Sequence, residues 1–182
     1  MNRLQTQYQK QLLPSLKKEL GLDNDLAAPK LEKIVVNMGI GDVSKDKTNR
    51  EKIVKYFTQI VGQKPQLSPA KKAIAEFGIR KGDPVGIRAT IRGQRMYEFL
   101  DKLVSIVLPR VRDFQGVKQA AFDDQGNYNL GLTEQIIFPE VKYDTIDRIR
   151  GLQITIKIKN ANKKSGYLLL KAFGMPFEKI EK

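Results

Sequence analysis

The segment from Val85 to Arg92 constrains this chain more than any other, because apolar and polar residues alternate along it without a break. Successive side chains of a β-strand point to opposite faces, so this pattern predicts a strand with one face on a core. The opposite face would be cationic and rich in hydrogen-bond donors. The two faces are Val85, Ile87, Ala89 and Ile91 on the core side, and Gly86, Arg88, Thr90 and Arg92 on the outer side.

The outer face of this strand suits a phosphate backbone better than a small metabolite. Arginine offers a delocalised charge and several donors in one plane, which is the chemistry that phosphates require. The alternative is an ordinary hydrated face, because antiparallel sheets often leave one side in water. This strand alone leaves both interpretations open.

Two further segments, 31–38 and 153–159, alternate in the same way. If all three strands belong to one sheet, their outer residues form a basic platform. Few aromatic side chains lie on it, so we expect recognition of backbone and shape rather than stacking of single-stranded bases. The platform residues are Lys33, Asn37, Arg88, Thr90, Arg92, Thr155, Lys157 and Lys159.

The remaining pattern predicts helices between and around these strands. Apolar residues recur at helical spacing, and glycine or proline follows each segment. Pro14 lies inside the first helix and is expected to kink or split it. The expected elements are helices over 2–20, 46–61, 93–108 and 163–173, a short extended piece over 66–68, an exposed loop over 76–83, and hairpin or loop structure over 113–131. We therefore predict one α+β domain spanning 1–182, an antiparallel sheet with helices packed on one face.

Charge points to a polyanionic partner. The chain carries 33 Lys+Arg against 20 Asp+Glu, which gives a net charge of +13. It contains no cysteine and no histidine, which excludes disulfides, thiolate chemistry and histidine-based catalytic or metal sites. A membrane is disfavoured as the partner, because no apolar run approaches the roughly 20 residues of a spanning helix and no basic amphipathic helix carries aromatic anchors.

The charge is unevenly distributed. Residues 63–95 hold eight basic and two acidic residues, whereas residues 113–140 hold five acidic residues and one basic residue. The first region could meet nucleic acid and the second a basic protein. A different class of function, a metal-dependent nuclease, would use the acidic residues Asp123, Asp124, Glu134 and Glu140. Their spacing matches no metal-ligand pattern, so an exposed acidic surface is the competing interpretation.

Several stretches, taken together and in order, resemble a known family from about residue 4 to residue 177. They are Lys33–Gly41 (KIVVNMGIG), Ile60–Pro65 with Ser68–Lys72, Gly86–Arg92 (GIRATIR), Leu108–Gly116, Gly126–Gly131, Gln135–Glu140 (QIIFPE) and Phe173–Phe177. This set is similar to the bacterial members of the ribosomal protein L5 family, which bind 5S rRNA in the central protuberance of the large ribosomal subunit.

The resemblance implies a non-enzymatic, cytoplasmic ribosomal protein with no catalytic residue, metal or cofactor. It implies contacts with 5S rRNA, the P-site tRNA, 23S rRNA, other large-subunit proteins and a small-subunit head protein. Carried over by position, the rRNA-binding residues are Lys33, Asn37, Gln63, Arg88, Thr90 and Arg92. The loop that would touch tRNA contains Lys72, Arg80 and Lys81, and the surface that would bridge to the small subunit contains Asp113, Glu134 and Glu140.

Overall fold

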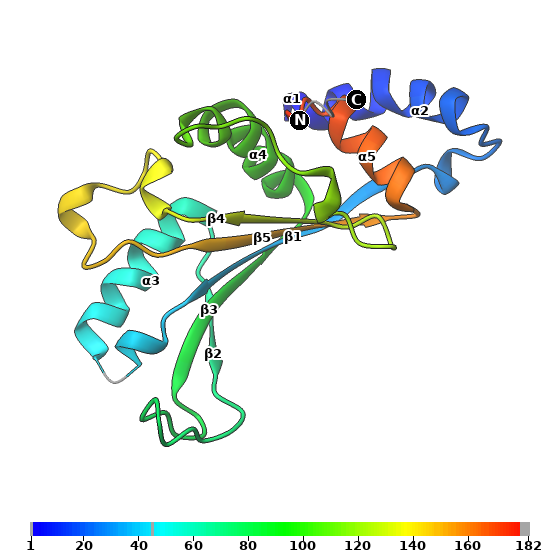
Figure 1. Cartoon of the computed structure of the whole chain (residues 1–182). Helices are drawn as coiled ribbons and strands as arrows, with labels where there is room; N and C mark the ends of the chain where they lie inside the picture. Colours follow the sequence, from blue (N-terminus) through cyan, green and yellow to red (C-terminus); the bar gives the residue numbers. More distant parts are fainter. Residues whose placement is uncertain (1, 45, 179–182) are drawn as a thin grey trace. The chain divides into compact units, whose positions relative to one another are not determined.

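A five-stranded antiparallel sheet organises the computed structural model, which describes residues 2–44 and 46–178 (Figure 1). The strand order is β2-β3-β1-β5-β4. The strands are β1 (Lys30–Gly39), β2 (Gln66–Pro69), β3 (Pro84–Ile91), β4 (Tyr128–Leu132) and β5 (Leu152–Lys159). The three alternating segments are β1, β3 and β5, and the predicted extended piece is β2. The α+β fold with an antiparallel sheet is therefore confirmed.

Within the part of the chain that the structure describes, five α-helices accompany the strands, and all four predicted helical segments are present. They are α1 (Arg3–Gln7), α2 (Leu13–Leu20), α3 (Lys47–Val61), α4 (Gly93–Lys102) and α5 (Lys163–Ala172). The segment after α4 continues as a π-helical turn, Leu103–Val107, and a short 3₁₀ turn, Leu108–Arg110. In α3 the side chain of Asp46 caps the first turn, and Gly62 ends the helix in the left-handed conformation that favours glycine.

The predicted N-terminal helix is interrupted as Pro14 requires. A π-helical turn, Tyr8–Leu12, separates α1 from α2. Proline has no N–H to donate and its ring crowds the preceding turn, and a wider π turn relieves both problems without ending the helix. Gly21 then closes α2 with a φ of 63°.

Contacts within the chain form two compact units, each assembled from distant segments. Unit 1 comprises Met1–Ile34, Arg92–Leu130 and Thr155–Lys182, and unit 2 comprises Val35–Ile91 and Gly131–Ile154. The organisation as a single domain stays a prediction.

In unit 1 the helices contact one another in pairs, α1 with α4 and α2 with α5. Tyr8 stacks on Phe173, with ring centroids 6.0 Å apart, and Tyr97 meets Phe173 edge-on at 6.2 Å. A second aromatic group joins Phe122 and Tyr128, whose centroids are 4.7 Å apart. All five of these rings are buried and add apolar area to the core of unit 1.

In unit 2 helix α3 packs against β3. Ile53, Phe57 and Ile60 on the helix are fully buried, as are Ile87 and Ile91 on the strand. Arg88, which alternates with these strand residues, is exposed. The apolar face of the strand therefore lies under the helix, and Arg88 on its polar face is exposed.

The segment 113–131 contains the hairpin that was expected as one alternative, together with a strand that was not recognised. Phe122 and Tyr128 form an antiparallel bridge around a tight turn. The strand β4 follows directly, and its residues Tyr128, Leu130 and Leu132 are buried.

Candidate nucleic-acid interface

The polar face of unit 2 is centred on Arg88. Arg88 and Gln66 are paired across the antiparallel strands β3 and β2. The guanidinium donates from Nη2 to Oε1 of Gln66 over 3.2 Å and from Nε to the same oxygen over 3.4 Å. Both side chains are exposed. The amide therefore orients the guanidinium without neutralising it, and its charge remains available.

Asn37, Gly86 and Thr90 continue this face on β1 and β3. A Cβ atom placed on Gly86 would lie 3.9 Å from Oδ1 of Asn37 and 3.6 Å from Cβ of Ser68, so the exposed Asn37 lies beside the glycine. The alternation predicted Gly86 on the outer face, but Gly86 itself is buried, because Asn37 and Ser68 on the two neighbouring strands flank it. Thr90 follows Arg88 on the same face of β3 and is half-buried.

Gln63, which follows the end of α3, reaches the same strand. Its Nε2 donates to the backbone carbonyl of Thr90 over 3.4 Å. Within unit 2 the structure thus brings together four of the six residues that the resemblance assigns to rRNA binding. These residues are Asn37, Gln63, Arg88 and Thr90.

The other two residues, Lys33 and Arg92, belong to unit 1. Lys33 is half-buried on β1 and Arg92 is exposed at the end of β3. An acidic residue that the sequence did not single out lies among the cations of this unit. Glu32 is 3.8 Å from Nη1 of Arg92 and 3.9 Å from Nζ of Lys157. It reduces the positive charge around these two side chains.

Glu32 reaches these cations because β1 interrupts its alternation. Leu31 and Ile34 are both buried, and two half-buried residues, Glu32 and Lys33, separate them. A strict period of two would have placed Glu32 on the core side with Ile34. Consecutive charged residues inside a strand were the only available signal of this break.

The β2–β3 hairpin carries the residues expected to contact tRNA. Lys72, Arg80 and Lys81 are all exposed on its loop. The backbone N–H of Arg80 donates to Oδ2 of Asp83 over 2.8 Å, so Asp83 is engaged in shaping the loop. The prediction of an exposed basic loop is confirmed, and the contact of this loop with tRNA stays a prediction.

The acidic residues do not build a metal centre. Across residues 2–44 and 46–178 no three acidic side chains gather closely enough to hold a metal ion. Asp123 instead organises the turn before β4, accepting hydrogen bonds from the backbone N–H groups of Gln125 and Asn127 and from the Asn127 amide. Partial burial opposes ionisation there, but these hydrogen bonds outweigh it and lower the pKa of Asp123.

The three residues expected to contact a small-subunit protein are divided between the two units. Asp113 is exposed in unit 1, and Glu134 and Glu140 are half-buried in unit 2. Asp113 also adopts a left-handed backbone, with a φ of 51°.

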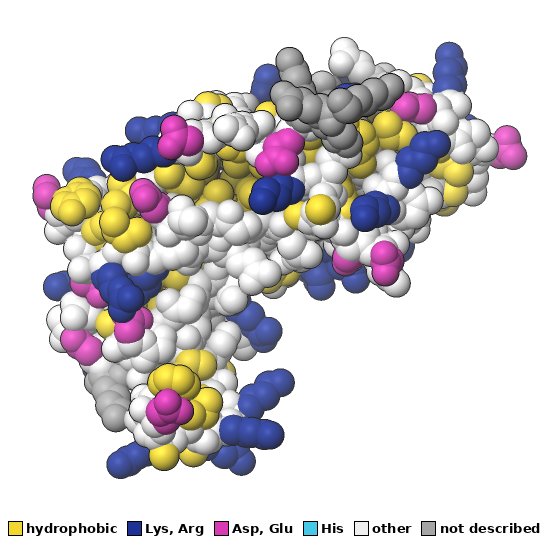
Figure 2. All heavy atoms as spheres, viewed as in Figure 1, with side chains coloured by type: hydrophobic (Ala, Val, Ile, Leu, Met, Phe, Trp, Pro, Cys, Tyr) yellow, Lys and Arg dark blue, Asp and Glu magenta, His cyan; other side chains and the backbone are white. Residues whose placement is uncertain are grey.

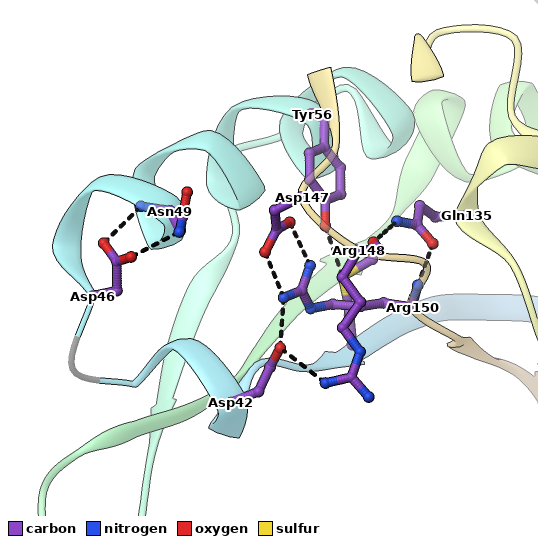
Figure 3. A network of polar contacts seen from close by, with 9 residues as sticks. Asp42, Asp46, Asn49, Tyr56, Gln135, Asp147, Arg148 and Arg150 are labelled. Atoms are coloured by element: carbon purple, nitrogen blue, oxygen red, sulfur yellow. Dashed lines mark hydrogen bonds and ion pairs between the residues drawn. The ribbon is translucent and has the colours of Figure 1, made fainter. Parts of the chain in front are cut away.

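A buried arginine network, which sequence reasoning missed, fixes unit 2 (Figure 3). Arg150 is only 6% exposed. Its Nη2 lies 2.6 Å from Oδ2 of Asp42, and its Nη1 lies 2.7 Å from Oδ1 of Asp147. The fully buried Gln135 accepts from the backbone N–H of Arg150 and donates to the carbonyl of Arg148 over 2.7 Å. The network thereby ties the turn after β1 to the segment that precedes β5.

Hydrogen bonds to Asp147 raise the pKa of Arg150, burial opposes this rise, and Asp42 adds to it. The same hydrogen bonds hold the pKa of Asp147 below its ordinary value of 3.8. A buried charge of this kind is tolerated because two carboxylates surround it. The role of Arg150 is structural, because its charge is neutralised by Asp42 and Asp147.

Comparison with known proteins shows the family of this chain. The family model described as "Ribosomal protein L5" matches residues 24–80, and a second model, described as the C-terminus of the same ribosomal family, matches residues 84–177. The large ribosomal subunit protein uL5 of Francisella tularensis subsp. novicida is 52% identical over 178 residues, covering 98% of this chain and 99% of the relative. The protein of the same name from a Psychrobacter species is 51% identical over 178 residues and is covered completely.

The chain belongs to the ribosomal protein L5 family. It is accordingly a structural, non-enzymatic constituent of the large ribosomal subunit, where its partners are rRNA and other ribosomal proteins. The nuclease alternative is thereby excluded. No helix within the described residues is long and apolar enough to cross a lipid bilayer.

Proposed function

We propose that this chain binds 5S rRNA through the polar face of its sheet. The observation that carries the proposal is the exposed guanidinium of Arg88, held by Gln66 and placed on strands β2 and β3, which contain no acidic residue. Phosphate groups meeting this face would find a fixed cation with amide and hydroxyl groups around it. Such a surface positions an RNA backbone and reads its shape.

Binding would proceed by neutralisation of phosphates. Arg88, Arg92 and Lys33 would displace counterions condensed on the RNA, which supplies the favourable free energy. Asn37, Gln63 and Thr90 would exchange hydrogen bonds with sugar and phosphate oxygens.

Two further contacts belong to the same proposal. The hairpin residues Lys72, Arg80 and Lys81 would meet the P-site tRNA. The acidic residues Asp113, Glu134 and Glu140 would meet a basic protein of the small-subunit head. Membership of the family supports both contacts, as does the opposite sign of charge in the two regions.

A filter-binding titration of the purified chain against 5S rRNA tests the main contact. The titration is repeated over a salt series, with an unrelated RNA of similar length as competitor. We expect binding that survives the competitor and weakens steeply with salt. Equal affinity for both RNAs would reduce the chain to a generic basic protein and overturn the proposal.

A further inference from the structure

The tip of the β2–β3 hairpin combines rigidity with an exposed aromatic ring. The backbone N–H of Ile74 donates to the carbonyl of Ile79 over 2.9 Å, and the reverse bond spans 3.1 Å. Inside this pair the N–H of Gly78 donates to the carbonyl of Ala75 over 2.9 Å, and Gly78 adopts a φ of 61°. The tip is therefore a miniature hairpin closed by its own hydrogen bonds.

Phe77 stands on this closed turn and is 69% exposed. An exposed phenylalanine contributes little of the favourable free energy that its burial in a core would give. Ile74, which closes the same turn by pairing with Ile79, is 44% exposed, so the tip carries two exposed apolar side chains rather than one. Rigid display of apolar groups away from the core is typical of a contact surface.

The charges around this surface favour RNA as its partner. Four cations, Lys71, Lys72, Arg80 and Lys81, are exposed on the two sides of the loop. Of the two acids, Asp83 is engaged by the N–H of Arg80, and Glu76 lies next to Phe77 in the sequence. Figure 2 shows this end of the molecule at the bottom of the view, where hydrophobic side chains surround an acidic one and basic side chains project at the sides.

This arrangement separates two kinds of contact. Phosphates are attracted by the cations at the sides and repelled by Glu76 at the tip. The group that meets Phe77 should therefore be uncharged and flat, which describes the face of a nucleobase. Inside a duplex both faces of each base are covered by its neighbours, so an available face occurs only at loops and helix ends.

We infer that Phe77 is a stacking residue that packs on an exposed base plane of a folded RNA, while the flanking cations hold the adjacent phosphates. The inference rests on the proposed contact of this hairpin with tRNA and names what the tip of the hairpin recognises. Affinity would then have an apolar component that salt does not screen, besides the electrostatic one.

The absence of tryptophan from the chain makes the test direct. Phe77→Trp introduces a single indole at the tip, and stacking on a base quenches indole fluorescence. Leu26→Trp is the matched control, since Leu26 is 74% exposed and lies in unit 1. Each full-length variant is titrated with a tRNA transcript and with a long duplex RNA, whose base planes are covered except at its rare ends.

We expect tRNA to quench the indole of Phe77→Trp strongly, and duplex RNA to quench it little at equal occupancy. The indole of Leu26→Trp should respond to neither RNA. Absence of quenching of the tip indole by tRNA, or equal quenching by duplex RNA, would overturn the inference, as would a blue shift of its emission with anionic vesicles alone.

Removal of the ring gives a second measurement. Phe77→Ala should weaken tRNA binding about tenfold with an unchanged salt slope, as removal of one aromatic–base stack does. Lys81→Gln should instead reduce the magnitude of the slope of log affinity against log salt concentration, because it removes a phosphate contact. An unaltered affinity in Phe77→Ala would likewise refute base stacking.

The same preparations are tested for selective binding of 5S rRNA. Selective 5S rRNA binding with an unresponsive tip indole refutes base stacking and leaves the proposed rRNA contact intact. Loss of 5S rRNA selectivity with a quenched tip indole refutes the rRNA contact and leaves base stacking standing.

Discussion

Arg150 and Asp42 lie 108 residues apart in the chain, yet Nη2 of the arginine is 2.6 Å from Oδ2 of the aspartate. Asp147 holds the other side of the same guanidinium. The side chain of Arg150 is 5% exposed, whereas those of Asp42 and Asp147 are 33% and 25% exposed. The pairing therefore brings one buried charge to two carboxylates that keep partial access to water.

Replacing Arg150 with methionine should destabilise the protein. The substitution leaves two carboxylates beside each other without their shared cation, but partial hydration lessens the cost to about 2–3 kcal/mol in the free energy of unfolding. Urea denaturation measures this change. The control is Arg148→Gln, because Arg148 is 69% exposed and 3.5 Å from Asp42, and its loss should cost less than about 0.5 kcal/mol. Equal effects of the two substitutions would contradict a structural role for the buried network.

The same network predicts a loss of stability in acid. The folded pKa of Asp147 is depressed by its hydrogen bonds to Arg150. Asp147 therefore contributes stability above its unfolded pKa, and the contribution disappears as pH falls through the lower folded pKa. As the pH is lowered from about 5 to about 2, the urea concentration at the unfolding midpoint of the wild type should decrease. The midpoint of the Arg150→Met variant should decrease less over the same range. Parallel curves for both proteins would be incompatible with this linkage.

Gly166→Ala should be destabilising, although the same change stabilises most helices by about 1 kcal/mol. A Cβ atom on Gly166 would lie 2.5 Å from the backbone oxygen of Gly126, so the first turn of α5 and the turn at 126 would have to separate. We expect a loss of about 2 kcal/mol, typical of overpacking against backbone. Gly131→Ala is the control, because no atom of the described residues lies within 4 Å of the added carbon. Thermal unfolding of both variants shows whether each substitution stabilises or destabilises the protein.

Arg88 and Gln66 should affect RNA binding in different ways. Arg88→Gln removes one phosphate contact and should reduce the magnitude of the slope of log K against log salt by about 0.9. Gln66→Leu frees the guanidinium without removing its charge, so affinity should fall while the slope stays unchanged. Filter binding to 5S rRNA over a salt series measures both quantities. Matching slope changes in the two variants would argue against an orienting role for Gln66.

Removal of Glu32 should tighten RNA binding. Glu32→Gln releases Arg92 and Lys157 from their carboxylate partner and eliminates repulsion of phosphate, so we expect affinity to rise about two- to fivefold. Glu51→Gln is the matched control, because Glu51 pairs with Lys47 at 4.0 Å on α3. An equal rise in both variants would show an effect of net charge alone, and the location of Glu32 would then be irrelevant.

Much of the sheet was predictable because local alternation records which side of a strand is buried. The sequences of β3 and β5 alternate, and all their isoleucines are buried as expected. The strand β4 escaped recognition because its sequence, YNLGL, contains asparagine and glycine, which are ordinarily found in turns. Its three buried residues still alternate, so the signal was present but weak.

The parts that could not be predicted depend on contacts between distant residues. Nothing near Arg150 in the sequence shows that Asp42 will reach it or that Gln135 will be buried beside it. Glu32 likewise joins Arg92 and Lys157 only because β1 breaks its period after Leu31. The individual rRNA, tRNA and protein contacts were assigned by resemblance, and their residues remain predictions.

The stacking of Tyr8 on Phe173 has a consequence for synthesis on the ribosome. Tyr8 leaves the exit tunnel before Phe173 is made, so this aromatic contact forms only after the later segment has emerged. Until then Tyr8, which is buried in the folded protein, lacks its aromatic partner. The nascent chain would thus expose an apolar segment, and early capture by a chaperone would protect it until residue 173 emerges.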